Sequence, residues 1–173
     1  MHRWMLIGLM TVATAAHAQQ VDLKSLDKFA STAKDVTQIK LDESMIKSGS
    51  SLLNDKKGDE AAAKKTASSL KGLYLRAFEF DKKGVFKSED LKPIRDQLKS
   101  PDWVPFLQSR ESGEETEIWI HRTNGAADGI LLFAMESDEL VVINAIGIGR
   151  PEDLSTIGKQ FGVPLPELGD KRE

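Results

Sequence analysis

Apolar and polar residues alternate along much of the second half of the chain, which is the pattern of half-buried β-strands. Six segments show this alternation or a short unbroken apolar run, and a strand is expected in each: 36–41, 73–80, 104–110, 116–123, 130–136 and 140–148. The last four strands are separated only by short turns at Ser112-Gly113, Asn124-Gly125 and Ser137-Asp138. Because such connections are too short for parallel crossovers, these strands should form an antiparallel meander.

Apolar residues spaced three and four apart predict helices in the remaining segments. The expected helices cover 23–33, 42–53, 60–70, 88–98 and 151–161. Together, the strands and helices predict a single α+β domain. In it, an antiparallel sheet of five to six strands carries four to five packed helices.

The first 18 residues have the layout of a secretory signal peptide. His2 and Arg3 precede an apolar run that ends at Ala16, and Ala16-His17-Ala18 supplies the small-x-small pattern that signal peptidase accepts. The run is too short to span a bilayer, which needs about 20 residues. We therefore expect cleavage after Ala18 and export to the periplasm or the extracellular space.

Cleavage at this point would divide the chain into the signal peptide 1–18, the α+β domain 19–164 and a C-terminal tail 165–173. A lipid anchor would require a cysteine just after the cleavage point. The chain contains no cysteine, so the exported protein is not expected to be lipid-anchored.

Composition narrows the possible functions. The 173 residues include 24 basic and 27 acidic side chains, a near balance that argues against a nucleic-acid partner. The absence of cysteine excludes disulfides, thiolate metal sites and a cysteine nucleophile. His2 and His17 lie in the signal peptide, which leaves His121 as the one histidine of the exported chain. We therefore expect neither a metal site nor a cofactor.

Two segments resemble ligand-binding loops but lack essential residues. Segment 79–90 has the glycine and the final carboxylate of a calcium-binding loop, but Lys83 occupies a position that needs an oxygen ligand. Segment 147–152 resembles a dinucleotide-binding turn, but Glu152 replaces its third glycine and no βαβ unit follows. Neither loop is expected to bind its ligand.

The sequence contains few candidate catalytic groups. No G-x-S-x-G nucleophile elbow occurs, and a carboxylate pair would have to come from residues such as Glu79, Glu117 and Glu136. We therefore expect a non-enzymatic binding or interaction module. A carboxylate-dependent hydrolase is the alternative, and a stress-related partner of a membrane protein is a third.

The last two predicted strands are apolar on both faces, so each face must be covered. Either the helices are divided between the faces, or one face binds a protein, a second copy of the chain or an apolar ligand. The candidate binding residues are Trp119, His121, Met135, Arg76 and Asn144. For Arg76 and Asn144, a structural role satisfied by neighbouring groups is the competing interpretation.

The segment Lys71-Gly-Leu-Tyr-Leu-Arg-Ala-Phe-Glu-Phe-Asp81 carries a resemblance to a known family, supported by Leu140-Val-Val-Ile-Asn144 and by the final helix ending in Phe161-Gly-Val-Pro164. The chain resembles the secreted bacterial proteins that contain domain of unknown function 4252, over roughly residues 23–164. The resemblance implies an exported envelope protein with no established activity and no known catalytic residues.

Overall fold

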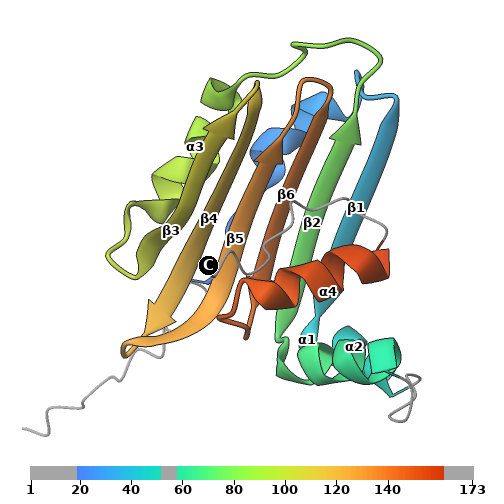
Figure 1. The fold of residues 1–173 in the computed structure, drawn as a ribbon, viewed down its shortest axis with the longest axis vertical. Coiled ribbons are helices and arrows are strands. Elements are labelled where there is room, and N and C mark those ends of the chain that lie inside the picture. Colours follow the sequence, from blue (N-terminus) through green and yellow to red (C-terminus); the bar gives the residue numbers. More distant parts are fainter. Residues whose placement is uncertain (1–18, 52–57, 162–173) are drawn as a thin grey trace, which may run out of the picture.

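The central feature of the fold is a six-stranded antiparallel sheet with the strand order β1-β2-β6-β5-β4-β3 (Figure 1). The structure, a computed structural model, describes residues 19–51 and 58–161. The expected signal peptide and C-terminal tail lie outside these residues. The strands are β1 (Asp35–Asp42), β2 (Gly72–Glu79), β3 (Trp103–Glu111), β4 (Glu114–Thr123), β5 (Ala126–Met135) and β6 (Glu139–Ile146).

Strands β3 to β6 form the meander, and β6 returns to pair with β2, which in turn pairs with β1. The hairpin turns have positive φ angles at Ser112 (51°), Gly113 (92°), Asn124 (52°) and Gly125 (82°), as tight two-residue hairpins require. Strand β3 lies at an edge, where Pro105 can be accommodated because no further strand needs its missing N–H.

Helical segments lie on both faces of the sheet (Figure 1). One face carries η1 (Lys24–Phe29), η2 (Ser88–Leu91), α3 (Lys92–Arg95) and η3 (Asp96–Lys99). The other carries α1 (Glu43–Ser50), α2 (Gly58–Ser69) and α4 (Glu152–Phe161). In the described part of the chain, no helix is both long enough and apolar enough to cross a membrane.

The predicted fold class, an α+β domain with four to five packed helices, is wrong. The molecule is mostly sheet, and its helices are short: α2 has 12 residues and α3 only four. The helix predicted over 88–98 is divided into η2, α3 and η3. Pro93, in the first turn of α3, has no N–H to bond to the preceding turn, which accounts for the break between η2 and α3. The helix predicted over 23–33 is reduced to the 3₁₀-helix η1.

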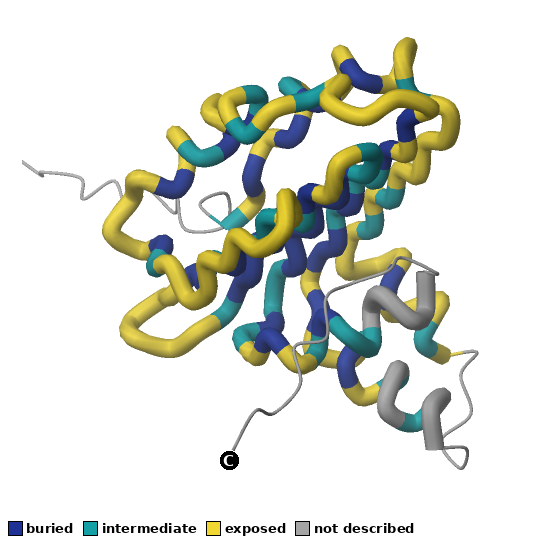
Figure 2. The backbone as a smooth tube through the Cα atoms, turned by 45° about the horizontal axis from the view of Figure 1, so that its top comes forward, coloured by how far each residue is buried: buried dark blue, intermediate teal, exposed yellow. Residues whose placement is uncertain are grey.

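Each face of the sheet has its own hydrophobic cluster. Figure 2 shows the buried residues concentrated in the central strands, with exposed residues along the edges and turns. On one face, Phe78, Phe133 and Val142 pack against Leu26 of η1 and Ile94 of α3. The opposite cluster includes Leu75, Leu132 and Ile143 of the sheet, together with Ile46 and Leu154 of the helices. The helices are thus divided between the two faces.

Candidate functional site

The five candidate residues lie on one face of the sheet. Trp119 pairs with Leu131, which pairs with Asn144, so these residues share a row across the strands. The same alternation places His121, Met135 and Arg76 on that face. We call it the strap face, because residues 19–23, the N-terminal strap, lie across it.

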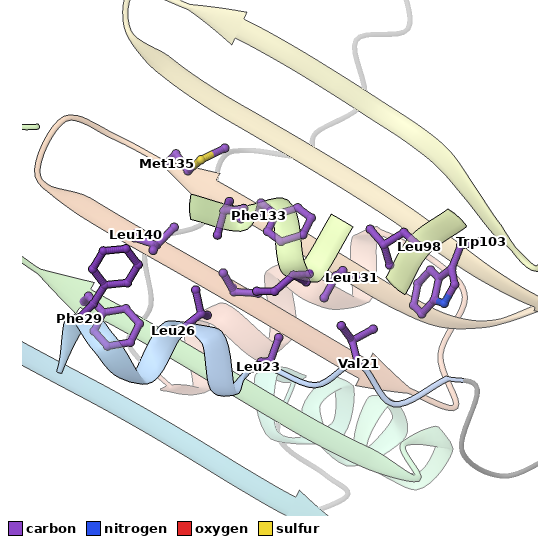
Figure 3. Close-up of a cluster of buried hydrophobic side chains, with 14 of the residues drawn as sticks. Val21, Leu23, Leu26, Phe29, Leu98, Trp103, Leu131, Phe133, Met135 and Leu140 are labelled. Carbon is purple, nitrogen blue, oxygen red and sulfur yellow. The ribbon is translucent and has the colours of Figure 1, made fainter. Parts of the chain in front are cut away.

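The strap face is covered by the N-terminal part of the chain. In Figure 3, Val21 and Leu23 of the strap and Phe29 of η1 point toward Leu131 and Leu140 of the sheet. Val21 and Leu23 are buried, although the strap has no regular secondary structure. Burial of its apolar side chains therefore contributes to holding the strap in place.

Asn144 fastens the strap to the sheet through hydrogen bonds. Its side chain is completely buried: Oδ1 accepts from the backbone N–H of Val21 (3.0 Å), and Nδ2 donates to the carbonyls of Gln19 (3.2 Å) and Ile130 (3.3 Å). The carboxamide thus provides the strap with a donor and an acceptor, as a neighbouring strand would. Asn144 therefore joins the strap to the sheet.

The side-chain carboxamide of Gln97, in η3, also forms hydrogen bonds with the backbone of the strap. Its Oε1 accepts from the N–H of Asp22 (2.8 Å), and its Nε2 donates to the carbonyl of Asp22 (2.9 Å). Two carboxamides distant in sequence therefore satisfy the strap's backbone, which explains how an irregular segment is ordered on the sheet.

His121 lies beneath the start of the strap. The ring is buried, its Nδ1 is 2.7 Å from Asp128 Oδ1, and the other oxygen of Asp128 accepts from the side chain of Gln19. Because a carboxylate only accepts, Nδ1 carries a proton and Nε2 is left without a hydrogen bond. The ring also packs edge-on against Trp103, with centroids 5.0 Å apart. The imidazole is therefore tied to the strap through Asp128.

A pocket of about 470 Å³ opens between the strap and strands β1 and β2. We call it the strap pocket. Its lining consists of Gln20, Val21, Asp22, Leu23, Lys24, Lys40, Tyr74 and Arg76. Three of these side chains are cationic and one is acidic, and the Asp22 carboxylate already accepts from the backbone N–H of Lys24 (2.9 Å). The strap pocket therefore combines apolar walls with a positive rim.

Arg76 is the one sequence-predicted candidate in the strap pocket. With the Gln38 carboxamide oriented to satisfy both groups, its oxygen accepts from Arg76 Nη1 (3.0 Å) and Nη2 (2.8 Å). Arg76 Nε is buried without a hydrogen bond, and Asp27 Oδ1 lies 3.8 Å away. The guanidinium is thus oriented by Gln38 while one of its donors stays unused.

Trp119 lines a different pocket, of about 420 Å³, on the same face near the opposite edge of the sheet, formed by β3 and β4. We call it the Trp119 pocket. Its lining consists of Ser88, Arg95, Gln108, Ser109, Arg110, Glu115, Glu117 and Trp119. The indole N–H of Trp119 donates to Glu117 Oε2 (3.2 Å), so this side chain is held by the pocket's own residues.

Charged groups in the Trp119 pocket pair with one another. Arg95 Nε donates to the buried Glu117 (2.9 Å) and its Nη2 to Ser88 Oγ (2.9 Å), while Arg110 donates to Glu115 (2.6 Å). Burial alone would raise the pKa of Glu115, but the hydrogen bond and charge of Arg110, followed by Ser88 and Arg95, lower it overall. The network matches both of its carboxylates to arginines.

Met135, the remaining candidate, is buried in the hydrophobic cluster of the strap face and lines neither pocket. The structure therefore separates the five candidates. Arg76 lines the strap pocket and Trp119 lines the Trp119 pocket. Asn144 binds the strap directly, and His121 is linked to it through Asp128.

Of the carboxylates considered for a hydrolase, Glu79 and Glu136 both lie near Glu139, and Glu117 lies apart from them in the Trp119 pocket. Glu117 is paired with Arg95, and Glu79 accepts from Lys34 (2.7 Å). The pKa of Glu139 is raised, first by its burial and then by the negative charges of Glu136, Glu79 and Asp138. Glu117 lines the Trp119 pocket, whereas Glu79, Glu136 and Glu139 line neither pocket.

The calcium-like segment 79–90 is used structurally. Asp90, its last residue, accepts from the Lys87 N–H (2.8 Å) and from Lys28 (2.5 Å), and the charge-assisted bond with Lys28 lowers the pKa of Asp90. Within residues 19–51 and 58–161, no group of three His, Cys, Asp or Glu side chains is placed to hold a metal ion.

Several residues of the site were not identified from the sequence. Lys40 and Tyr74 come together because β1 and β2 pair in a register that places them opposite each other. Alternation within 36–41 and 73–80 gave the face of each side chain but not the register. Gln97 and Asp128 left no signal, because their roles depend on contacts with the distant strap.

The comparisons with known proteins place this fold in a family. The family model described as Domain of unknown function (DUF4252) matches residues 29–157, which include β1 to β6 and most of the strap face. No curated protein and no solved structure matches the chain. The matched region covers well over half of the sequence, and the chain therefore belongs to the DUF4252 family.

Proposed function

We propose that the protein is an exported, non-enzymatic binding module of the bacterial envelope and that its ligand site is the strap pocket. The observation that carries this proposal is a pocket of about 470 Å³ that contains the buried Arg76 Nε, which has no hydrogen bond, beside Lys40 and Tyr74, whose polar atoms have no partner among the described residues. Pockets of this size, with apolar walls and a few polar groups, are typical of small-molecule sites.

Export is supported by the signal-peptide pattern of residues 1–18. Gln19, the residue that cleavage would expose, is also the first whose carbonyl is held by Asn144. Removal of the preceding residues would therefore leave the whole strap on the sheet. The intact mass of the protein isolated from the envelope should correspond to a chain starting at Gln19, with or without loss of ammonia by cyclisation. A mass that includes residues 1–18 would contradict export by cleavage.

Ligand binding is tested by native mass spectrometry of the protein isolated from the cell envelope. The wild-type protein should carry a small-molecule adduct, and Lys40→Trp should lose it because the indole fills the rim of the strap pocket. Lys40 is exposed on a strand, where an aromatic residue is well accommodated.

Gln108→Trp is the matched control, since it places the same side chain at the Trp119 pocket. Loss of the adduct in Lys40→Trp alone supports the proposal. An adduct-free wild-type protein, or an adduct that both variants retain, would overturn it.

A further inference from the structure

We infer, on the basis of the proposed function, that the ligand of the strap pocket is a small organic anion: a carboxylate or a phosphate monoester attached to a short apolar body. The inference names the chemical class of ligand from the groups that the pocket leaves unsatisfied.

The register of β1 and β2 brings the relevant donors together. Lys40 lies opposite Tyr74 and Gln38 lies opposite Arg76, so Lys40, Tyr74 and Arg76 occupy adjacent positions on the strap face. All three side chains line the strap pocket. The juxtaposition results from strand pairing and does not depend on a mobile loop.

These donors have unused hydrogen-bonding capacity. Arg76 Nε is buried without a hydrogen bond, and in the described part of the chain neither Lys40 Nζ nor the Tyr74 hydroxyl has a hydrogen-bond or ion-pair partner. A buried donor without an acceptor is costly, so an acceptor bound here would gain more than at an ordinary surface. The groups are all donors, and two of them are cations, which favours an anionic acceptor over a neutral one.

Acidic side chains near the pocket do not cancel this preference. Asp22 is engaged with the N–H of Lys24, and Asp27 is largely exposed on η1, 3.8 Å from Arg76 Nε. Gln38 accepts from Nη1 and Nη2 of the guanidinium and leaves Nε without a hydrogen bond. The orientation of Arg76 is therefore set before a ligand arrives, which lowers the entropic cost of binding.

The remaining lining indicates an apolar body. Val21 and Leu23 of the strap and the ring of Tyr74 form the walls beside the cationic rim. An inorganic anion would satisfy the donors but leave these walls in contact with water. An amphipathic anion would satisfy both.

The test is calorimetric titration of the protein, after its small-molecule adduct has been removed, with octanoate, octyl phosphate, octanol and inorganic phosphate. At least one of the octyl anions should bind about tenfold or more tightly than octanol and inorganic phosphate. A preference for octanoate would identify a carboxylate headgroup, and a preference for octyl phosphate would identify a phosphate.

Arg76→Gln and Lys40→Gln should each weaken binding of the preferred anion about tenfold. Lys83→Gln removes the same charge from the turn beyond the opposite end of β2 and should leave binding unchanged. Lys40 is exposed, so its variant tests the inference even if Arg76→Gln folds poorly.

Equal binding of octanol and the anions would overturn the inference, as would wild-type affinity in both pocket variants or failure of both octyl anions to bind. None of these results would decide the proposed function. That proposal is judged by the adduct of the native protein and its loss in Lys40→Trp.

Discussion

The strap pocket and the Trp119 pocket lie on the same face of one sheet and have similar volumes, about 470 and 420 Å³, but they differ in how their charges are satisfied. In the Trp119 pocket, Arg95 and Arg110 bind Glu117 and Glu115. In the strap pocket, Arg76 Nε has no hydrogen bond. Size and charge alone therefore do not identify a binding site. A hollow whose charges are internally matched stabilises the fold, whereas unmatched donors are available to a ligand.

The largest expected loss of folding stability distinguishes Arg95 of the Trp119 pocket from Arg76 of the strap pocket. Arg95→Gln should destabilise the protein by about 3 kcal/mol, because it leaves the buried carboxylate of Glu117 without its cation. Arg76→Gln should cost only about 1 kcal/mol, since its partners Asp27 and Gln38 are exposed. Urea unfolding of both variants measures the difference. Equal losses would show that the two pockets do not differ in this way.

Removal of the Asn144 side chain, which fastens the strap to the sheet, should cause the next largest loss of folding stability. Asn144→Ala leaves the N–H of Val21 and the carbonyl of Gln19 without partners, so we expect a loss of about 2–3 kcal/mol. Hydrogen exchange at the Val21 amide should become much faster than in wild type. Gln97→Ala is the matched comparison, with a loss of about 1 kcal/mol because Gln97 is exposed. Unchanged exchange at Val21 in Asn144→Ala would contradict the role of Asn144 in fastening the strap.

Trp119→Ala tests whether the strap face is covered or is a contact surface. Trp119 is half-buried, packs against the hydrophobic cluster and donates to Glu117, so its loss should cost about 2 kcal/mol of folding stability. Self-association, followed by sedimentation, should not change. A variant with wild-type stability and weakened association would instead identify Trp119 as part of a partner-binding surface.

The smallest expected change in stability concerns Glu139, which lies among acidic residues at an end of the sheet and lines neither pocket. Burial and the neighbouring charges of Glu136, Glu79 and Asp138 raise the pKa of Glu139 above its ordinary value of 4.5. The folded state therefore favours the protonated form, and stability should fall as pH rises from below 4.5 through the raised pKa.

Glu139→Gln should accordingly stabilise the protein at pH 7 by less than about 1 kcal/mol, with the gain disappearing below pH 4. Melting curves at both pH values measure it, with Glu111→Gln, an exposed change at the end of β3, as the control. A gain that persists in acid would contradict the electrostatic explanation.

The strands of the fold could be predicted from the sequence because their signals are local. Period-two alternation marked segments close to β1–β6, and the Ser112-Gly113 and Asn124-Gly125 pairs marked hairpins whose φ angles are indeed positive. The helices were less predictable. The apolar spacing of 88–98 indicated which residues face the sheet, as Leu91, Ile94 and Leu98 do, but not that Pro93 would interrupt the α-helix.

The strap and its pocket could not be predicted, because they arise from contacts between distant segments. Asn144 binds the strap at a separation of 123 residues, and Gln97 binds it at 75. Arg76 was identified as a candidate from its polarity in an apolar strand, whereas Lys40 looked like any exposed strand lysine. Only the pairing of β1 with β2 brings the two cations to one pocket.

The most direct test of the strap pocket as the ligand site uses one aromatic residue in each pocket. Tyr74, the single tyrosine of the chain, lines the strap pocket, and Trp119 lines the Trp119 pocket. Protein labelled with fluorotyrosine and fluorotryptophan gives ¹⁹F NMR signals in which Tyr74 reports the strap pocket, and the tryptophan signal that is lost in Trp119→Ala reports the Trp119 pocket. On titration with the octyl anion that binds more tightly, the Tyr74 signal should move and saturate while the Trp119 signal stays in place. Movement of the Trp119 signal with an unchanged Tyr74 signal would contradict the assignment of the strap pocket as the ligand site.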